Sequence, residues 1–194
     1  QARLISAQGD WLLRETDLDK PPLTLFSTAL SFALLGPSEF AARLPNVFAS
    51  MLTLAAVYRL SLVLHADRTA AAIAALWLAL SPFDLAFAAT AFTDVQATLW
   101  ALIACALAVR GRWRLAGLAA ALMVAAKTTA LLLPPLIVVL GVLSSPRAEE
   151  GRRVVLRQVG RFAFTFAAGI AILLLWDVAR APRSFWALGW ARND

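Results

Sequence analysis

Seven apolar stretches dominate this chain, and their lengths restrict it to folds that a lipid bilayer can surround. They cover residues 23–35, 42–64, 70–89, 95–109, 115–126, 131–143 and 162–176, and polar or Pro/Gly-containing segments separate them. Several approach the length needed to cross a hydrocarbon core ~30 Å thick. Of the 194 residues, 61% are hydrophobic and 15% are charged, whereas soluble domains are about 45–50% apolar and about 25% charged. The sequence therefore predicts an all-α polytopic membrane protein and excludes a soluble enzyme.

The first stretch differs from the others in length. Its 13 residues, 23–35, form a helix of only ~20 Å at 1.5 Å per residue, which is too short to cross the bilayer. Gly36-Pro37-Ser38 then breaks the helix. We expect residues 23–35 to lie along the membrane interface.

The stretches 115–126 and 131–143 are either one helix interrupted by Lys127-Thr128-Thr129 or two short spans that meet there. With two spans, the loops 66–69, 110–114 and 144–161 share one side and hold nine arginines against three acidic residues. The other polar segments hold eight basic and nine acidic residues. Arginine-rich loops of membrane proteins are cytoplasmic. This asymmetry favours the hairpin, because a single span would place the five arginines of 144–161 outside.

We therefore expect a single transmembrane domain over residues 1–194, similar to part of a larger bundle. Residues 1–41 form an extracytoplasmic segment with the interfacial helix, residues 42–178 form about six spans, and residues 179–194 begin an extracytoplasmic loop. The chain starts at Gln1 rather than at Met, and no signal peptide pattern precedes the first polar stretch. This start is typical of an internal fragment.

The charge and the metal-binding residue types do not indicate nucleic acid, a metal or another cofactor as a partner. The net charge is +6, but topology explains basic loops in a membrane protein. Cys105 and His65 are the only cysteine and histidine, and neither has a partner at the spacing of a metal site.

Asp94 is the most informative carboxylate, because it opens the apolar stretch 95–109 at the expected outer boundary. Ionisable groups at a membrane boundary are costly and usually face a cavity or a partner. Aspartate is also a preferred helix N-cap, so the sequence leaves both roles open. Asp84 follows Ser81-Pro82-Phe83, where an Asx-turn is the favoured interpretation.

Three cations near the outer boundary are candidate ligands of an anionic group. Lys20 follows Asp19 and precedes a proline pair that starts a helix, so it is either an interfacial anchor or a phosphate ligand. Lys127 is either a phosphate ligand or the polar tip of the hairpin, and the tip is favoured. Arg43 is either an anchor or a contact to an anionic headgroup.

Several motifs, taken in order, resemble the N-terminal region of GT-C glycosyltransferases of the aminoarabinose-transferase and protein O-mannosyltransferase type. The resemblance covers roughly residues 7 to 143. It is carried by Gly9-Asp10-Trp11, Asp19-Lys20-Pro21-Pro22-Leu23, Gly36-Pro37-Ser38-Glu39-Phe40-Ala41-Ala42-Arg43-Leu44-Pro45, Ser81-Pro82 with Thr93-Asp94, and Gly117-Leu118 with Ala126-Lys127-Thr128.

The resemblance implies a membrane enzyme that takes a sugar from a polyprenyl-phosphate-linked donor. The acceptor is then a hydroxyl of a lipid, glycan or protein, on the extracytoplasmic face of a bacterial inner membrane. Lys20 matches the family's lipid-phosphate ligand, Asp19 its acidic neighbour, and Asp94 an acidic position that lines the cavity. A phosphate leaving group departs without full protonation if cations neutralise its charge, so one carboxylate suffices for an inverting displacement.

Two departures from the family pattern stand out. The family's leading catalytic aspartate would lie upstream of Gln1, and Thr90 stands where many relatives carry arginine. We expect the fragment to be inactive alone. Asp94 and Asp19 are its candidate catalytic residues, and Lys20, Arg43 and Lys127 its candidate substrate ligands.

The alternative is a polytopic transporter or flippase-like permease, which also needs polar groups in a membrane cavity. Such folds often contain inverted repeats and binding sites near the bilayer midplane. Here the polar residues gather at the outer boundary and no repeat is visible, which favours the transferase. A structural membrane subunit without chemistry is a third interpretation.

Overall fold

The computed structural model describes residues 2, 3, 5, 9–13, 18, 20–144 and 152–180. Every regular element with stated bounds in this part of the chain is a helix, which confirms the all-α prediction. The elements are α2 (Pro22–Leu35), α3 (Glu39–His65), α4 (Arg68–Ala79), α5 (Pro82–Ala88), α6 (Thr93–Val109), α7 (Trp113–Ala126), the 3₁₀ helix η1 (Thr128–Leu132), α8 (Pro134–Leu143) and α9 (Arg152–Val178).

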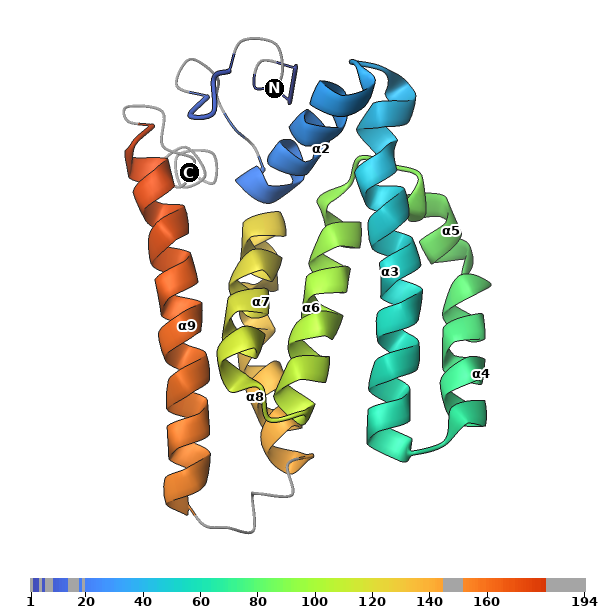
Figure 1. Cartoon of the computed structure of the whole chain (residues 1–194), viewed down its shortest axis with the longest axis vertical. Coiled ribbons are helices and arrows are strands. Elements are labelled where there is room, and N and C mark those ends of the chain that lie inside the picture. The colour runs from blue at the N-terminus through green and yellow to red at the C-terminus, as the bar shows by residue number, and fades with distance from the viewer. Residues whose placement is uncertain are drawn as a thin grey trace, which may run out of the picture.

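The long helices stand side by side as a bundle with two distinct ends (Figure 1). α7 packs between α6 and α9, and α3 packs against α4 and α6. The turns that were predicted to share the arginine-rich side, 66–67 and 110–112, lie together at one end. The starts of α3 and α6 lie at the other, which is called the upper end below. Among the described residues, the predicted loops at 66–67 and 110–112 therefore lie at the end opposite the segments that precede α3 and α6.

α2 runs obliquely above the ends of α6 and α7 rather than beside them. Proline at its first position, Pro22, starts it without loss of a helical hydrogen bond. Gly36 ends it at φ +78°, a conformation that favours glycine, with its N–H donating to Phe32 O at 2.9 Å. The predicted bounds were correct within one residue, and the interfacial placement of α2 stays a prediction.

The hairpin at Lys127 is present, because α7 and α8 run in opposite directions on either side of η1. Two other predicted segments differ. The stretch 70–89 is broken at Ser81-Pro82, where α4 and α5 meet at 60°. Residues 152–161, which were expected to be part of a loop, form the beginning of α9. Their arginines therefore lie on a helix.

The predicted count of about six spans is not confirmed. By length and composition, two helices in the described residues can cross a membrane, α3 and α9, and the bent pair α4–α5 makes up to three. The remaining apolar helices have 10–17 residues.

The distribution of side chains is inverted relative to a soluble protein. Large apolar side chains point outward, among them Leu132 (83% exposed) and Trp77 (79% exposed). The core between α6, α7, α8 and α9 consists largely of small residues, such as Ala104, Ala116 and Ala120. Outward apolar side chains and small residues at helix contacts are typical of a bundle that packs within lipid.

Candidate active site

An ion pair between Asp94 and Lys127 lies at the upper end of the bundle. Asp94 belongs to the first turn of α6, and Lys127 follows α7 directly. Both side chains are partly exposed, at 46% for Asp94 and 36% for Lys127. The fold therefore brings together two charged residues that stand 33 positions apart in the sequence.

Local structure explains why each charge lies there. The N-cap of α6 is Phe92, without a side-chain cap, so the N-cap interpretation of Asp94 is wrong. A carboxylate in the first turn is still favoured by the helix dipole. Lys127 has an extended backbone that ends α7, and its carbonyl accepts a hydrogen bond from Ala130 N–H at 3.1 Å. It is thus fixed between α7 and η1, at the hairpin tip, with its ammonium directed to Asp94.

The pair opens onto a cavity of about 460 Å³ between α6 and η1. Its polar lining comes from Asp94, Thr98, Lys127 and Thr129, and its remaining lining is apolar. A cavity with a few convergent polar groups on apolar walls is the usual form of a small-molecule site. Lys127 therefore lies at the hairpin tip and also lines a cavity, so its two interpretations, as polar tip and as phosphate ligand, do not exclude each other.

Asp84 lies close to this site but has a structural role. It is in the first turn of α5, where its N–H donates to Ser81 Oγ at 3.5 Å and its Oδ2 accepts from Ser50 Oγ at 2.9 Å. The expected Asx-turn is wrong, because Ser81 caps a helix there instead. Asp84 and Asp94 share a second cavity of about 130 Å³. In the described part of the chain, no three side chains of metal-binding types gather at one point.

Two buried amides that the sequence interpretation missed support the loop before Asp94. Asn46 Nδ2 donates to Thr90 O and to Phe92 O, both at 2.7 Å. Gln96 Nε2 donates to Asn46 Oδ1 at 2.9 Å and to Ser27 Oγ at 2.8 Å. Both amides are buried, with exposures of 3% and 6%. The sequence signal for both residues was a single amide side chain inside an apolar stretch. Such a side chain indicates a hydrogen-bond partner on another helix, because buried polar groups in membrane helices need partners.

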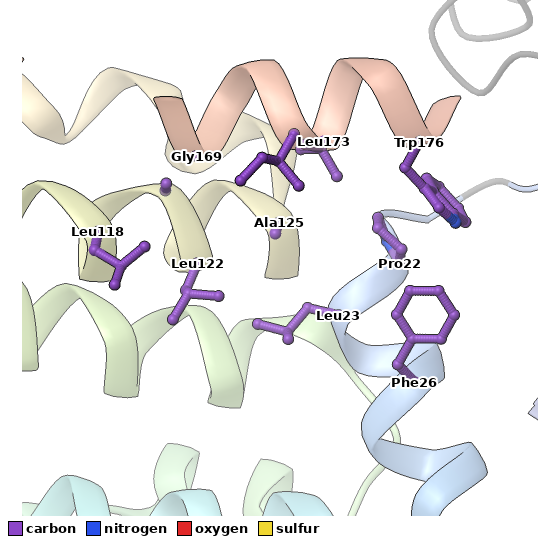
Figure 2. A pocket seen from close by; sticks show the side chains of 11 residues that line it. Pro22, Leu23, Phe26, Leu118, Leu122, Ala125, Gly169, Leu173 and Trp176 are labelled. Carbon is purple, nitrogen blue, oxygen red and sulfur yellow. The ribbon is translucent and has the colours of Figure 1, made fainter. Parts of the chain in front are cut away.

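An apolar groove of about 290 Å³ lies on the other side of α7, between α7, α9 and the start of α2. Figure 2 shows Leu23 and Phe26 of α2, Leu122 of α7, and Leu173 and Trp176 of α9 around it. Its lining is almost entirely carbon. Ala125 of α7 lines the groove, and Lys127, which directly follows α7, lines the polar cavity.

The other predicted ligands do not join the Asp94–Lys127 pair. Lys20 is exposed, two residues before Pro22 at the groove, and has no hydrogen bond or ion pair with any described residue. Arg43 pairs with Glu39 on the surface of α3 and does not line the cavity at Asp94. Asp19 lies outside the described residues, and its catalytic role stays a prediction.

One comparison with known proteins gave a match. A family model described as dolichyl-phosphate-mannose-protein mannosyltransferase matches residues 19–176. The matched range contains Lys20, Asp94 and Lys127 and all of the lining of the apolar groove. Neither the curated proteins nor the solved structures gave a match.

Proposed function

Because the chain belongs to the dolichyl-phosphate-mannose-protein mannosyltransferase family, of the GT-C glycosyltransferase type, we propose that it transfers a sugar from a polyprenyl-phosphate-linked donor to an acceptor hydroxyl. The acceptor belongs to a lipid, a glycan or a protein. Family membership favours this reaction over transport by a permease. The observation that supports the site is the Asp94–Lys127 pair beside a cavity of about 460 Å³.

The apolar groove is the proposed place of the donor's polyprenyl chain. Its walls carry no charged side chain, and burial of an isoprenoid chain there contributes roughly 25 cal/mol per Å² of apolar surface removed from water. Lys20 lies two residues from the groove wall at Pro22 and is available to the lipid phosphate. Ala125 of the groove and Lys127 of the polar cavity are two residues apart at the end of α7, which supports the proposal that one donor reaches both.

The proposed chemistry is an inverting displacement. The acceptor oxygen forms a bond to the anomeric carbon while the bond from that carbon to the phosphate oxygen breaks, and the acceptor proton passes to a carboxylate. Lysine ammonium groups neutralise the charge that develops on the phosphate, which is the role assigned to Lys20 and Lys127. Asp94 accepts a hydrogen bond from the acceptor hydroxyl and orients its oxygen toward the sugar.

The proposed location is the extracytoplasmic face. Asp94 and Lys127 lie at the end of the bundle opposite the arginine-rich turns, and such turns face the cytoplasm.

Developing charge is stabilised best by groups held in place before the reaction, and the ion pair holds both side chains in this way.

Transfer from a radiolabelled polyprenyl-phosphate sugar by the purified full-length protein tests the proposal. Loss of one charge-stabilising donor typically slows turnover by about a hundred- to a thousand-fold, and we expect this for Lys127→Ala. Lys127→Arg should keep part of the activity, because the charge stays while the geometry changes. Asp94→Asn should slow turnover at least about tenfold, as it removes the acceptor's anionic partner.

Asp67→Asn is the matched control. Asp67 caps α4 at the opposite end through Thr69 N–H, and asparagine caps equally well. The control should therefore retain full turnover. If Lys127→Ala and Asp94→Asn also retain it, the pair is a hairpin lock and the proposed site is wrong.

A further inference from the structure

Three side chains from three helices form a continuous hydrogen-bonded network, which is called the amide network below. Gln96 of α6 stands at its centre and uses both hydrogens of its amide nitrogen. One is donated to Asn46 Oδ1 of α3 at 2.9 Å, and the other to Ser27 Oγ of α2 at 2.8 Å. Ser27 Oγ in turn donates to Thr24 O at 2.9 Å. Each of these donors therefore has a defined acceptor, which fixes the direction of the network from Gln96 outward.

One end of the amide network holds the loop that precedes Asp94. Asn46 Nδ2 donates to Thr90 O and to Phe92 O, both at 2.7 Å. Phe92 is the N-cap of α6 and offers no side-chain cap, so the start of α6 depends on contacts from other elements. Asp94 lies two residues after Phe92. The position of its carboxylate, and hence of the Asp94–Lys127 pair, follows from the position of this loop.

The other end of the amide network is Ser27, whose neighbours on α2 form a wall of the apolar groove. Leu23 and Phe26 of α2 line that groove (Figure 2). Phe26 packs edge-on against Trp176 of α9, with a distance of 5.6 Å between the ring centroids, and Trp176 lines the groove as well. Ser27 directly follows Phe26. One short helix therefore contacts both the contents of the groove and the amide network.

The position of α2 against the bundle carries an energetic cost. Thr24 Oγ1 and Ser31 Oγ, both on α2, are buried and have no hydrogen-bond partner among the described residues. Such atoms lose their hydration without compensation, and a movement of α2 away from the bundle would hydrate them again. Gly36 ends α2 at φ +78° with open space around it, so it is suited to act as a hinge. A ligand that binds only the seated position of α2 can therefore shift its population.

We propose that the amide network makes the position of Asp94 depend on the lipid chain in the apolar groove, with Gln96 as the positioning residue. This inference rests on the proposed function, which assigns the groove to the donor's polyprenyl chain. A chain that fills the groove holds α2 against the bundle. Ser27 then stays within reach of Gln96, and Gln96 keeps Asn46 on the loop before Asp94. Binding of a remote part of the donor thus orients the reacting end, which raises kcat as well as affinity.

Amide hydrogen exchange of residues 89–92 in the full-length protein, read by mass spectrometry, tests this coupling without sugar transfer. The probes are a long-chain polyprenyl phosphate and isopentenyl phosphate, whose single isoprene unit fills only part of the groove. In the unaltered protein, the long probe should slow exchange of the loop at least about fivefold, and the short probe less than about twofold. In Ser27→Ala, which removes the acceptor of Gln96 on α2, the long probe should also change exchange less than about twofold.

Thr28→Ala is the matched control. Thr28 Oγ1 donates to Thr24 O at 2.9 Å, as Ser27 Oγ does, but both hydrogens of Gln96 Nε2 are used elsewhere. This control should keep the response to the long probe, and so should Ser27→Thr, because the hydroxyl stays. An equal response in Ser27→Ala and in the unaltered protein would overturn the proposal. Loss of the response in Thr28→Ala would overturn it too, since any weakening of α2 would then have the same effect.

Turnover separates this inference from the proposed function. With a sugar linked to isopentenyl phosphate, kcat of the unaltered protein should be at least about tenfold below that with the long-chain donor, and in Ser27→Ala the two kcat values should agree within about twofold. No transfer at all by the unaltered protein would refute the proposed function, while the exchange data would still decide the coupling. Transfer with the same dependence on chain length in Ser27→Ala would refute the coupling and leave the transferase reaction standing.

Discussion

Gly169→Ala tests the contact between α7 and α9, on which one wall of the apolar groove depends. A Cβ atom added at Gly169 would overlap with Ala121 Cβ, far inside the ordinary contact range of 3.4–4 Å. Gly160 lies on the same helix, and a Cβ atom there meets nothing within 4 Å. Glycine to alanine therefore creates a steric conflict at Gly169 and none at Gly160.

The magnitudes follow from two opposing effects. Glycine to alanine inside a helix stabilises by roughly 0.5–1 kcal/mol, and this gain applies at both positions. An extra methyl group in a packed contact costs about 1–3 kcal/mol, and this cost applies only at Gly169. Ala121 Cβ is fixed to its backbone and cannot turn away, so the helices themselves must separate. Gly169→Ala should be about 1–3 kcal/mol less stable than Gly160→Ala.

Reversible unfolding in mixed micelles, followed by loss of helical circular dichroism, measures the difference. The double variant Gly169→Ala/Ala121→Gly moves the methyl group from one helix to the other. It should recover most of the stability lost in Gly169→Ala, less the roughly 0.5–1 kcal/mol that the new glycine costs inside α7. If Gly169→Ala is as stable as Gly160→Ala, or if the double variant recovers nothing, then α7 and α9 do not pack through this contact and the reasoning fails.

Two further predictions concern the loop before Asp94 and the orientation of the bundle. Asn46→Ala removes three hydrogen bonds, which average about 0.6 kcal/mol each in membrane proteins. It should therefore destabilise the protein by about 2 kcal/mol in the same unfolding assay. A change below ~0.5 kcal/mol would show that the amide does not support the loop. In a Cys105→Ser background, a membrane-impermeant maleimide on intact cells should label Glu39→Cys and leave Arg110→Cys unlabelled, and the reverse pattern would contradict the proposed orientation.

Prediction from sequence was accurate where the signal is local. Proline and glycine fix where α2 begins and ends, and Lys127-Thr128-Thr129 marks the hairpin because polar residues interrupt an apolar run. The stretch 70–89 was predicted without a break, so the bend of 60° at Ser81-Pro82 was missed. The start of α9 was missed because arginines continue a helix as readily as they form a loop.

The candidate site was predicted only in part. Asp94 and Lys127 were singled out separately, each from its position at a membrane boundary, yet nothing local indicated that they form an ion pair. Asn46 and Gln96 were not singled out, because one amide in an apolar stretch acquires a role only through a partner on another helix. Arg43 matched a family motif but pairs with Glu39 one turn away.

Hydropathy and arginine counts were enough to predict a membrane environment, an all-helical class and a shared end of the bundle for the turns at 66–67 and 110–112. Those properties depend on hydrophobicity summed over a segment and on arginine counts, which are independent of tertiary contacts. The partner of Asp94 and the small residues that let α7 approach α9 could be identified only from the packed helices. These contacts depend on the rotation and separation of helices, which packing fixes and no single segment encodes.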